Sequence, residues 1–260
     1  MSFETLHVAI EGGVAHLTLA RPEKHNALSS LMMDELISAA EKLSADPVVR
    51  AVVLSGEGKS FCAGGDLGWM RDQFTATRAE RIAEARRLAM TYRALDDLRK
   101  PVIAKVNGNT FGGGVGLLSV CDLVISADTA KFGLTEVRLG IIPATISPFV
   151  VARIGVSAAR GLFMSGKLID AGEAATIGLV NRAVPADALD DAVDAEIAHL
   201  LQASPEAACR AKALLKSLGN PITDDVIDRV IEQLADTWET AEAQEGVTAF
   251  FEKRVPSWRQ

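Results

Sequence analysis

The segment Asn107–Asp122, NGNTFGGGVGLLSVCD, places three consecutive glycines between a short apolar run and a longer one. The apolar residues 102–106 predict a buried strand, and the residues after Gly114 predict a helix. Glycine at such a junction allows a positive φ or a close approach of another group, and the first N–H groups of a helix are free to bind negative charge. The segment therefore predicts a strand, a tight turn and a helix, in which the turn serves either packing or the binding of an anion.

A second turn of the same form occurs earlier in the chain. Residues Phe61–Leu67 read FCAGGDL, in which an apolar approach leads to Gly64 and Gly65 and then to a helix expected to begin near Leu67. Backbone N–H groups that converge from two such turns can stabilise the negative charge that develops on a carbonyl oxygen. The two turns together indicate a substrate with a carbonyl or thioester group.

The rest of the chain predicts a β/α core followed by a helical C-terminal region. Two β-rich runs on either side of Gly12 and Gly13 predict an antiparallel hairpin. The polar loop Arg21–Leu28 precedes an amphipathic helix that Ser29 or Ser30 can cap. The predicted strands are Leu6–Ile10, Val14–Leu19, Val48–Leu54, Val102–Val106, Leu123–Ala127 and a short segment within Leu179–Val184. Further helices are predicted at residues 75–98, 157–164, 171–177, 187–203, 205–218 and 223–251.

Charge and cysteine content exclude several classes of protein. The chain has 260 residues, a net charge of −7 and a pI near 5.2, which argues against a binder of nucleic acid or of anionic membranes. Cys62, Cys121 and Cys209 are far apart and lie in apolar contexts, which is typical of reduced thiols and predicts a cytoplasmic protein. The sequence also predicts no export signal and no membrane-spanning segment.

Several common catalytic motifs do not fit the chain. Gly58-Lys59-Ser60 matches the end of a P-loop, but the first P-loop glycine would fall at Val53, inside a strand. The glycines of the central turn do not follow the register of a dinucleotide-binding fingerprint. The histidines lack metal-ligand spacing and no GxSxG motif is present, so we expect neither a metal site nor a serine triad. Acid–base chemistry is therefore expected of a carboxylate.

Glu136 is the leading candidate for that carboxylate. It lies in the largely apolar stretch 132–142, where burial would raise the pKa of a catalytic carboxyl group and a structural one would need a good partner. A salt bridge to the nearby Arg138 is the structural alternative. Asp66 and Asp122 follow a glycine turn or close a helix, where capping is the usual role of aspartate.

Taken together, these segments resemble the crotonase superfamily, which contains the enoyl-CoA hydratases and isomerases. The resemblance runs from RPEKHNAL through FCAGGDL, NGNTFGGGVGLLSVCD and KFGLTEVRLGIIP to the terminal FFEKR. It implies an α/β fold, a crotonase-like spiral of ββα units with a helical C-terminal trimerisation region. Residues 1–200 would form the spiral core with the acyl-CoA site, and residues 201–260 the oligomerisation region of a homotrimer or of a homohexamer, a dimer of trimers.

The resemblance also implies a role for each motif. The N–H groups of Gly65 and Gly113 would form the oxyanion hole for the thioester carbonyl, and Glu136 would transfer the proton. Coenzyme A would enter as part of the substrate, so neither a separate cofactor nor a metal is implied. The positions implied to bind the CoA or acyl part of the substrate are Lys24, Ala27, Leu28, Ala63, Asp66, Leu67, Gly116, Phe250 and Lys253. In the family, the positions of Phe250 and Lys253 reach the CoA of a neighbouring subunit, although both could be helix surface here.

Gly116 departs from the family pattern. Hydratases of the family commonly carry a glutamate at this position, and it holds the reacting water together with the glutamate that Glu136 matches. One carboxylate fits hydration of a trans-2-enoyl-CoA and also fits a Δ3,Δ2-enoyl-CoA isomerase, and a catalytically weak acyl-CoA-binding protein is a third alternative. The motifs are similar to those of methylglutaconyl-CoA hydratases, which suggests a branched or carboxylated acyl group with Gly116 leaving room beside it.

Overall fold

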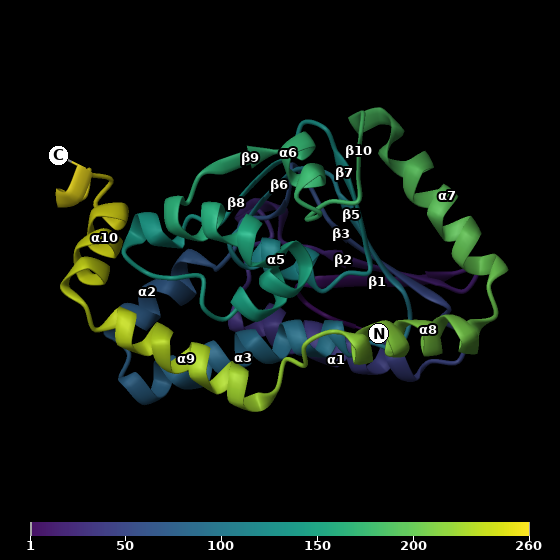
Figure 1. Ribbon diagram of the computed structural model, residues 1–260, viewed down its shortest axis with the longest axis horizontal. Helices are drawn as coiled ribbons and strands as arrows, with labels where there is room; N and C mark the ends of the chain where they lie inside the picture. Colours follow the sequence, from purple (N-terminus) through teal and green to yellow (C-terminus); the bar gives the residue numbers. More distant parts are fainter. Residues whose placement is uncertain (1, 260) are drawn as a thin grey trace.

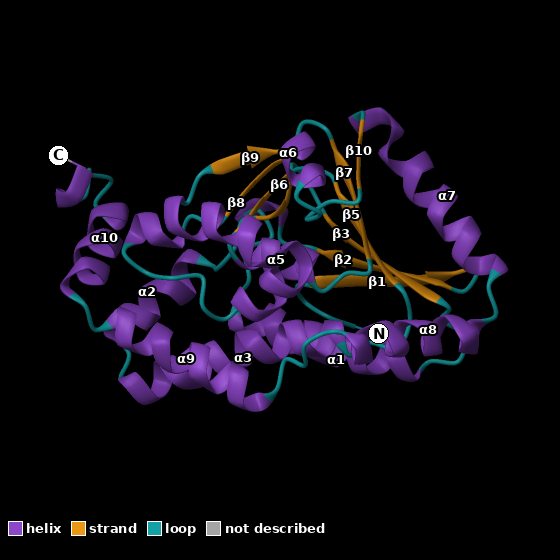
Figure 2. Ribbon diagram, viewed as in Figure 1, coloured by secondary structure: helices purple, strands orange, loops and turns teal. Residues whose placement is uncertain are grey.

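The computed structural model of the chain describes residues 2–259, in which helices surround two β-sheets (Figures 1 and 2). The larger sheet has the strand order β1-β2-β3-β5-β7-β10, and the smaller sheet has the order β4-β6-β8-β9. The strands of the larger sheet are β1 (Leu6–Glu11), β2 (Val14–Leu19), β3 (Ala51–Gly56), β5 (Val102–Val106), β7 (Leu123–Ala127) and β10 (Arg182–Val184). Those of the smaller sheet are β4 (Ser60–Cys62), β6 (Asn109–Phe111), β8 (Lys131–Gly133) and β9 (Leu168–Asp170). The expected α/β class is confirmed.

The central strands of the larger sheet, β3, β5 and β7, are buried on both faces. β1 and β2 form the predicted antiparallel hairpin, whereas the other neighbouring strands run parallel. Along β3, Val52 and Leu54 pack into the main core, while Val53 packs on the other face against residues of α7 (Leu189–Gln202). This arrangement explains why the parallel strands read as continuous apolar runs rather than as alternating ones.

Successive segments of the chain add one strand to each sheet and then a helix. β3 and β4 lead to α2 (Leu67–Thr75), β5 and β6 lead to α4 (Gly113–Ser119), and β7 and β8 lead to a 3₁₀ helix, η2 (Glu136–Leu139). Because β4, β6 and β8 are parallel neighbours, their carboxyl ends lie along one edge of the smaller sheet. The two glycine turns and Glu136 follow these ends, so this repeated ββα arrangement brings them together.

Several helix boundaries differ from the sequence prediction. The predicted helix 223–251 is wrong, because Thr240 leaves the helical conformation and caps α10 (Ala241–Phe251) after α9 (Asp224–Trp238) has ended. The predicted helix 75–98 is also wrong at its start, since Thr77 and Glu80 form a capping box at the head of α3 (Arg78–Asp96). α5 (Ser147–Ser165) begins ten residues earlier than predicted and contains a kink at Gly155. The remaining helices are α1 (Ser30–Ala45), α6 (Ala171–Thr176) and α8 (Pro205–Leu218).

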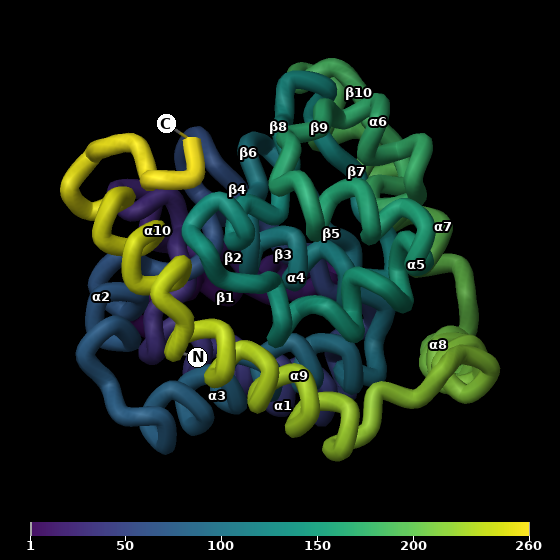
Figure 3. Tube along the Cα trace, turned by 60° about the vertical axis from the view of Figure 1, so that its left-hand side comes forward, coloured from purple at the N-terminus to yellow at the C-terminus, as the bar shows by residue number. Residues whose placement is uncertain are grey.

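The C-terminal helices make different contacts with the core. α9 packs along α3 through Ile227 and Ile231. α10 packs on η2, where Gly140 and Gly246 allow close approach: an added Cβ would lie 2.4 Å from the Glu242 carbonyl oxygen or 2.3 Å from that of Leu139. α8 lies at the periphery (Figure 3). The C-terminal segment therefore reaches the same edge of the smaller sheet as Glu136.

Candidate active site

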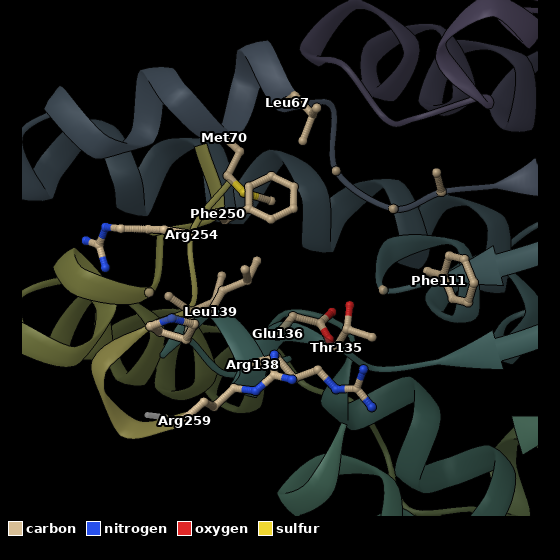
Figure 4. Close-up of a pocket in the computed structure, with 17 residues that line it drawn as sticks. Leu67, Met70, Phe111, Thr135, Glu136, Arg138, Leu139, Phe250, Arg254 and Arg259 are labelled. Atoms are coloured by element: carbon tan, nitrogen blue, oxygen red, sulfur yellow. The ribbon is translucent and has the colours of Figure 1, made fainter. Parts of the chain in front are cut away.

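A cavity of about 400 Å³ opens at this edge, within the usual range of small-molecule sites (Figure 4). Its lining residues come from the two glycine turns, α2, η2 and the C-terminal segment. They are Ala63, Gly64, Gly65, Leu67, Met70, Phe111, Gly112, Thr135, Glu136, Arg138, Leu139, Ile141, Gly246, Phe250, Arg254, Pro256 and Arg259. Of the predicted site residues, Ala63, Gly65, Leu67, Glu136 and Phe250 line this cavity.

The two glycine turns meet at the cavity. A Cβ added to Gly64 would lie 3.5 Å from the Gly113 nitrogen and 3.1 Å from the Phe111 carbonyl oxygen, so the backbones touch directly. Gly113 begins α4, where an N–H has no acceptor within the helix. Within residues 2–259, neither the Gly65 nor the Gly113 N–H donates a hydrogen bond to another backbone group. The two turns that carry these unused N–H groups are therefore in direct contact.

The turns are held in position by hydrogen bonds to other elements. Gly64 and Gly112 have φ values of 96° and 48°, conformations that side chains rarely allow. The Gly112 N–H donates to the Gly133 carbonyl at 2.9 Å, and the Leu28 N–H donates to the Gly64 carbonyl at 2.7 Å. These bonds connect each turn to a neighbouring segment and leave the Gly65 and Gly113 N–H groups unused.

Glu136 lies beside the central turn and points into the cavity (Figure 4). A Cβ added to Gly112 would lie 3.0 Å from Glu136 Oε1. The other oxygen, Oε2, is buried and has no hydrogen-bond partner among the described residues. Burial raises the pKa of the Glu136 carboxyl group from 4.5 to about 7, although its own backbone N–H lowers it. The expected alternative, a salt bridge to Arg138, is wrong, since no such ion pair occurs in the described part of the chain.

The loop Arg21–Leu28 is folded against the second turn. Asn26 is fully buried, and its side chain accepts from the Arg21 N–H and donates to the carbonyls of Glu57 and Ser60. The Ala63 N–H donates to the His25 carbonyl at 2.9 Å, which joins the loop to the glycine turn. Ala27 and Leu28 are buried beneath this contact, whereas Lys24 is exposed beside it. The loop therefore lies next to the second glycine turn but does not line the cavity, and its contact with CoA stays a prediction.

The two secondary aspartates have structural contacts. Asp66 caps α2 by accepting from the Gly68 N–H at 2.7 Å, and it pairs with Arg21 at 2.9 Å. Asp122 accepts from the Val102 N–H at 2.7 Å and pairs with Lys212 at 2.8 Å. The capping role expected for Asp66 is confirmed, and its side chain does not line the cavity.

The expectation that Gly116 opens space beside the substrate is wrong. Gly116 is buried within α4 and does not line the cavity. A Cβ added to it would lie 2.6 Å from Ile146 Cγ2 and 2.8 Å from Tyr92 Cε1. The space in front of Gly116 is filled by protein side chains, because α3 and the segment before α5 pack directly onto α4.

The C-terminal segment contributes to the cavity of its own chain. Phe250 lies on the same side as Leu67 and Met70, above Glu136 in the view of Figure 4. Lys253 is exposed, has a φ of 54° and does not line the cavity. The packing of α10 on η2 explains the position of Phe250, and only the tertiary structure shows it.

Three arginines that sequence reasoning did not place in the site line the cavity. Arg254 is neutralised by Glu245, at 2.6 and 2.7 Å, and by Glu252. Arg138 and Arg259 form no ion pair within residues 2–259, and they lie below Glu136 in Figure 4. Arg138 could have been found from the sequence, because it lies two residues after the candidate Glu136. Arg259 is brought to the cavity by the fold of the last residues.

No cluster of three or more histidine, cysteine, aspartate or glutamate side chains within residues 2–259 is arranged to hold a metal ion. None of the described helices combines the length and the apolar character needed to cross a bilayer.

Comparisons with known proteins agree with this geometry. The sequence profile described as enoyl-CoA hydratase/isomerase matches residues 9–260. A Thermus thermophilus protein named as an enoyl-CoA hydratase is 38% identical over 95% of this chain and 97% of its own. The solved structure of an enoyl-CoA hydratase from Shewanella pealeana has a TM-score of 0.81 at 37% identity, and covers 98% of this chain and 96% of its own. One from Mycobacterium avium has a TM-score of 0.85 at 34% identity and covers 98% of both chains. The chain therefore has the crotonase fold and belongs to the enoyl-CoA hydratase/isomerase family of the crotonase superfamily.

Proposed function

We propose that this protein hydrates a trans-2-enoyl-CoA to the 3-hydroxyacyl-CoA. The observation that carries the proposal is the meeting of two unused N–H donors, on Gly65 and Gly113, beside a buried carboxylate without a partner. A thioester oxygen that accepts from both donors would be stabilised as negative charge develops on it. Glu136 lies where it can exchange protons with a water molecule and with the acyl chain.

The proposed reaction balances with one carboxylate. Ionised Glu136 takes a proton from water, the water oxygen bonds to C3, and the electron pair of the C2–C3 double bond moves into the thioester as an enolate. Glu136 then returns the proton to C2, so that the elements of water are added and the carboxylate is regenerated. A pKa of about 7 suits a group that must both accept and donate a proton near neutral pH.

Separate incubation with a trans-2-enoyl-CoA and with a 3-enoyl-CoA tests this function. We expect the trans-2-enoyl-CoA to gain the mass of one water. A 3-enoyl-CoA that instead converts to its 2-enoyl isomer without a change of mass would favour the isomerase alternative. That alternative is supported by the same single carboxylate, since moving a proton between C2 and C4 needs only one base.

We further propose that the acyl group carries a carboxylate of its own, in addition to the thioester. Support comes from Arg138 and Arg259, which line the cavity without an ion-pair partner among the described residues. Arginine binds carboxylates through paired, charge-assisted hydrogen bonds. The apolar side formed by Leu67, Met70 and Phe250 would pack against the rest of a short chain. The argument for a carboxylated acyl group thus rests on these arginines, and no longer on the space that the sequence suggested at Gly116.

Arg138→Gln should remove a preference for carboxylated acyl groups. We expect the wild-type protein to bind glutaryl-CoA more tightly than butyryl-CoA, and the variant to lose about tenfold in affinity for glutaryl-CoA alone, because tenfold corresponds to one charge-assisted hydrogen bond of about 1.4 kcal/mol. Isothermal titration calorimetry measures both values without requiring turnover. Equal losses for both esters and for free CoA would show instead that the arginine binds the phosphates of CoA.

We also propose that the protein is a homotrimer or a homohexamer. Leu214, Leu215 and Leu218 of α8 are 59%, 71% and 75% exposed and share one face of the helix. The opposite side of α8 is held to the body by ion pairs of Lys212 and Lys216. Clustered exposed leucines are typical of an interaction surface, and a second copy of the chain would cover them.

Leu215→Glu should weaken this assembly, because it places a charge at the centre of the exposed leucines. We expect wild-type protein to have a mass of three or six times 27.6 kDa by light scattering, and the variant to shift towards a single chain. Ile10→Glu, which changes an exposed apolar residue of β1, is the matched control and should leave the mass unchanged. A wild-type mass of 27.6 kDa would contradict the proposal.

Finally, we infer a cytoplasmic location from the cysteines. Cys62, Cys121 and Cys209 are buried and unbridged. Free thiols of this kind persist in reducing compartments.

A further inference from the structure

Tyr92 lies directly beneath the turn that carries the Gly113 N–H. It belongs to α3, its side chain is fully buried, and its ring centroid lies 5.8 Å from that of Phe149. Its hydroxyl group donates to the Gly113 carbonyl oxygen at 3.1 Å, the only hydrogen bond that this phenol makes within the described residues. A buried tyrosine hydroxyl is normally satisfied by such a partner. The side chain therefore connects α3 to the first turn of α4.

This hydrogen bond acts on a backbone with little stiffness of its own. Residues 112–114 have no side chains, and α4 has only seven residues. Glycine has more accessible conformations than other residues, so the direction of the Gly113 N–H depends on contacts from outside the turn. The N–H and the carbonyl of Gly113 share one Cα, and fixing the carbonyl restricts the orientation of the N–H. An oxyanion hole is effective when its donors are oriented before the charge develops.

The ring of Tyr92 also fills the space that a side chain at position 116 would need. A Cβ added to Gly116 would lie 2.8 Å from Tyr92 Cε1, 2.9 Å from Tyr92 Cζ and 2.6 Å from Ile146 Cγ2. Both neighbours belong to the main hydrophobic core, where side chains are close-packed and cannot withdraw without a cost in stability. Position 116 therefore has no room for a carboxylate in this packing.

We propose that Tyr92 is a positioning residue of the active site: its hydroxyl orients the Gly113 N–H, and its ring, with Ile146, keeps a second carboxylate out of position 116. This inference rests on the proposed function, because the oxyanion hole is where Tyr92 acts. The phenol stays neutral, since burial, followed by the charges of Cys62 and Glu136, raises the pKa of its hydroxyl well above the ordinary value. It therefore donates a hydrogen bond without adding a charge next to Glu136.

Tyr92→Phe tests the role of the hydroxyl group while keeping the ring. We expect kcat for hydration to fall about tenfold, less than the loss of a whole oxyanion donor, with KM and the pH at which Glu136 titrates unchanged. Thr91→Val is the matched control, because it removes another buried hydroxyl of α3, one that bonds to the Arg87 carbonyl. Full kcat in Tyr92→Phe would overturn the positioning role, as would an equal fall in Thr91→Val.

The infrared stretching frequency of the thioester carbonyl in bound butyryl-CoA provides a readout without turnover. We expect binding to the wild-type protein to lower this frequency, because two N–H donors polarise the carbonyl, and we expect a smaller shift in Tyr92→Phe. Absence of a shift in the wild-type protein would contradict the oxyanion hole and with it the proposed function. A full shift in Tyr92→Phe would contradict only the role of Tyr92.

Gly116→Glu tests the proposal that Tyr92 and Ile146 leave no room for a carboxylate at position 116. We expect this variant to have a lower Tm than the wild-type protein and a hydration rate that does not exceed it, since the new side chain must displace Tyr92 or Ile146. Faster hydration at an unchanged Tm would show that position 116 accepts a second catalytic carboxylate, and would overturn this part of the proposal.

Discussion

Glu136→Gln should lower kcat for hydration by about 10²–10⁴-fold, the usual contribution of a general acid–base group. The substitution keeps the shape of the side chain but removes its ability to exchange a proton. Binding of a saturated acyl-CoA should change little, because the Gly65 and Gly113 N–H groups and the apolar side of the cavity remain. Asp128→Asn, which changes an exposed carboxylate in a loop away from the cavity, is the control and should have wild-type kinetics.

The pH profile gives a second measurement of the same group. The pKa of Glu136 is about 7, so kcat/KM of the wild-type protein should fall as the pH decreases below that value, because protonated Glu136 cannot activate water. The remaining activity of Glu136→Gln should lack this dependence. Wild-type turnover in the variant, or an unchanged pH profile, would contradict the assignment of Glu136.

The same raised pKa makes a prediction about stability. Between pH 4.5 and about 7 the folded protein keeps the proton on Glu136 that the unfolded chain releases, so the free energy of unfolding falls as the pH rises through this window. Glu136→Gln has no such cost and should therefore be more stable than the wild-type protein at pH 8, by about 3 kcal/mol. The difference should vanish near pH 4, as urea unfolding at both pH values would show.

Gly65→Pro should lower kcat by about 10²–10³-fold, the typical loss when one oxyanion donor is removed. The Gly65 N–H makes no hydrogen bond to another backbone group within residues 2–259, so its removal breaks no such contact. Gly113 is less suitable for this test, because a Cβ there would lie 2.9 Å from both Leu28 Cδ1 and the Tyr92 hydroxyl oxygen.

Gly65→Ala is the matched control for this experiment. It keeps the N–H, and its Cβ would meet only Trp69 ring atoms, at 3.3 and 3.4 Å. We expect Gly65→Ala to retain activity within about fivefold, since the donor is unchanged and the contact requires only a small movement of the Trp69 side chain. Circular dichroism and Tm would establish that both variants are folded. Equal activity of the proline and alanine variants would show that the Gly65 N–H does not stabilise the reaction.

The sequence predicted most of the core because its signals are local. The hairpin around Gly12 and Gly13 and the strand Val102–Val106 were predicted correctly. The split at Thr240 was missed, since amphipathic periodicity continues across it and only the cap interrupts the helix. The four strands of the smaller sheet, β4, β6, β8 and β9, were missed as well, because each has only three residues, which carry no periodicity, and their pairing depends on the sheet.

Part of the candidate site could also be predicted from the sequence. The sequence shows which chemical groups are present, namely glycines that leave N–H donors free and a glutamate in an apolar stretch. Whether Glu136 pairs with Arg138, however, depends on how η2 lies against the cavity, and the structure leaves the two unpaired. The occupation of the space at Gly116 by Tyr92 and Ile146 depends on residues 24 and 30 positions away in the chain.

By itself, then, the sequence determined most strands of the larger sheet, the two glycine turns and the candidate carboxylate at Glu136, whereas the ββα arrangement was implied only by the family resemblance. Only the tertiary structure decided that the two turns touch, that Glu136 stays unpaired, that Gly116 has no room for a side chain and that Phe250 lines the cavity of its own chain. The physical reason is that hydrogen-bonding capacity and periodicity belong to short segments, whereas the occupation of space results from close packing between segments far apart in the chain.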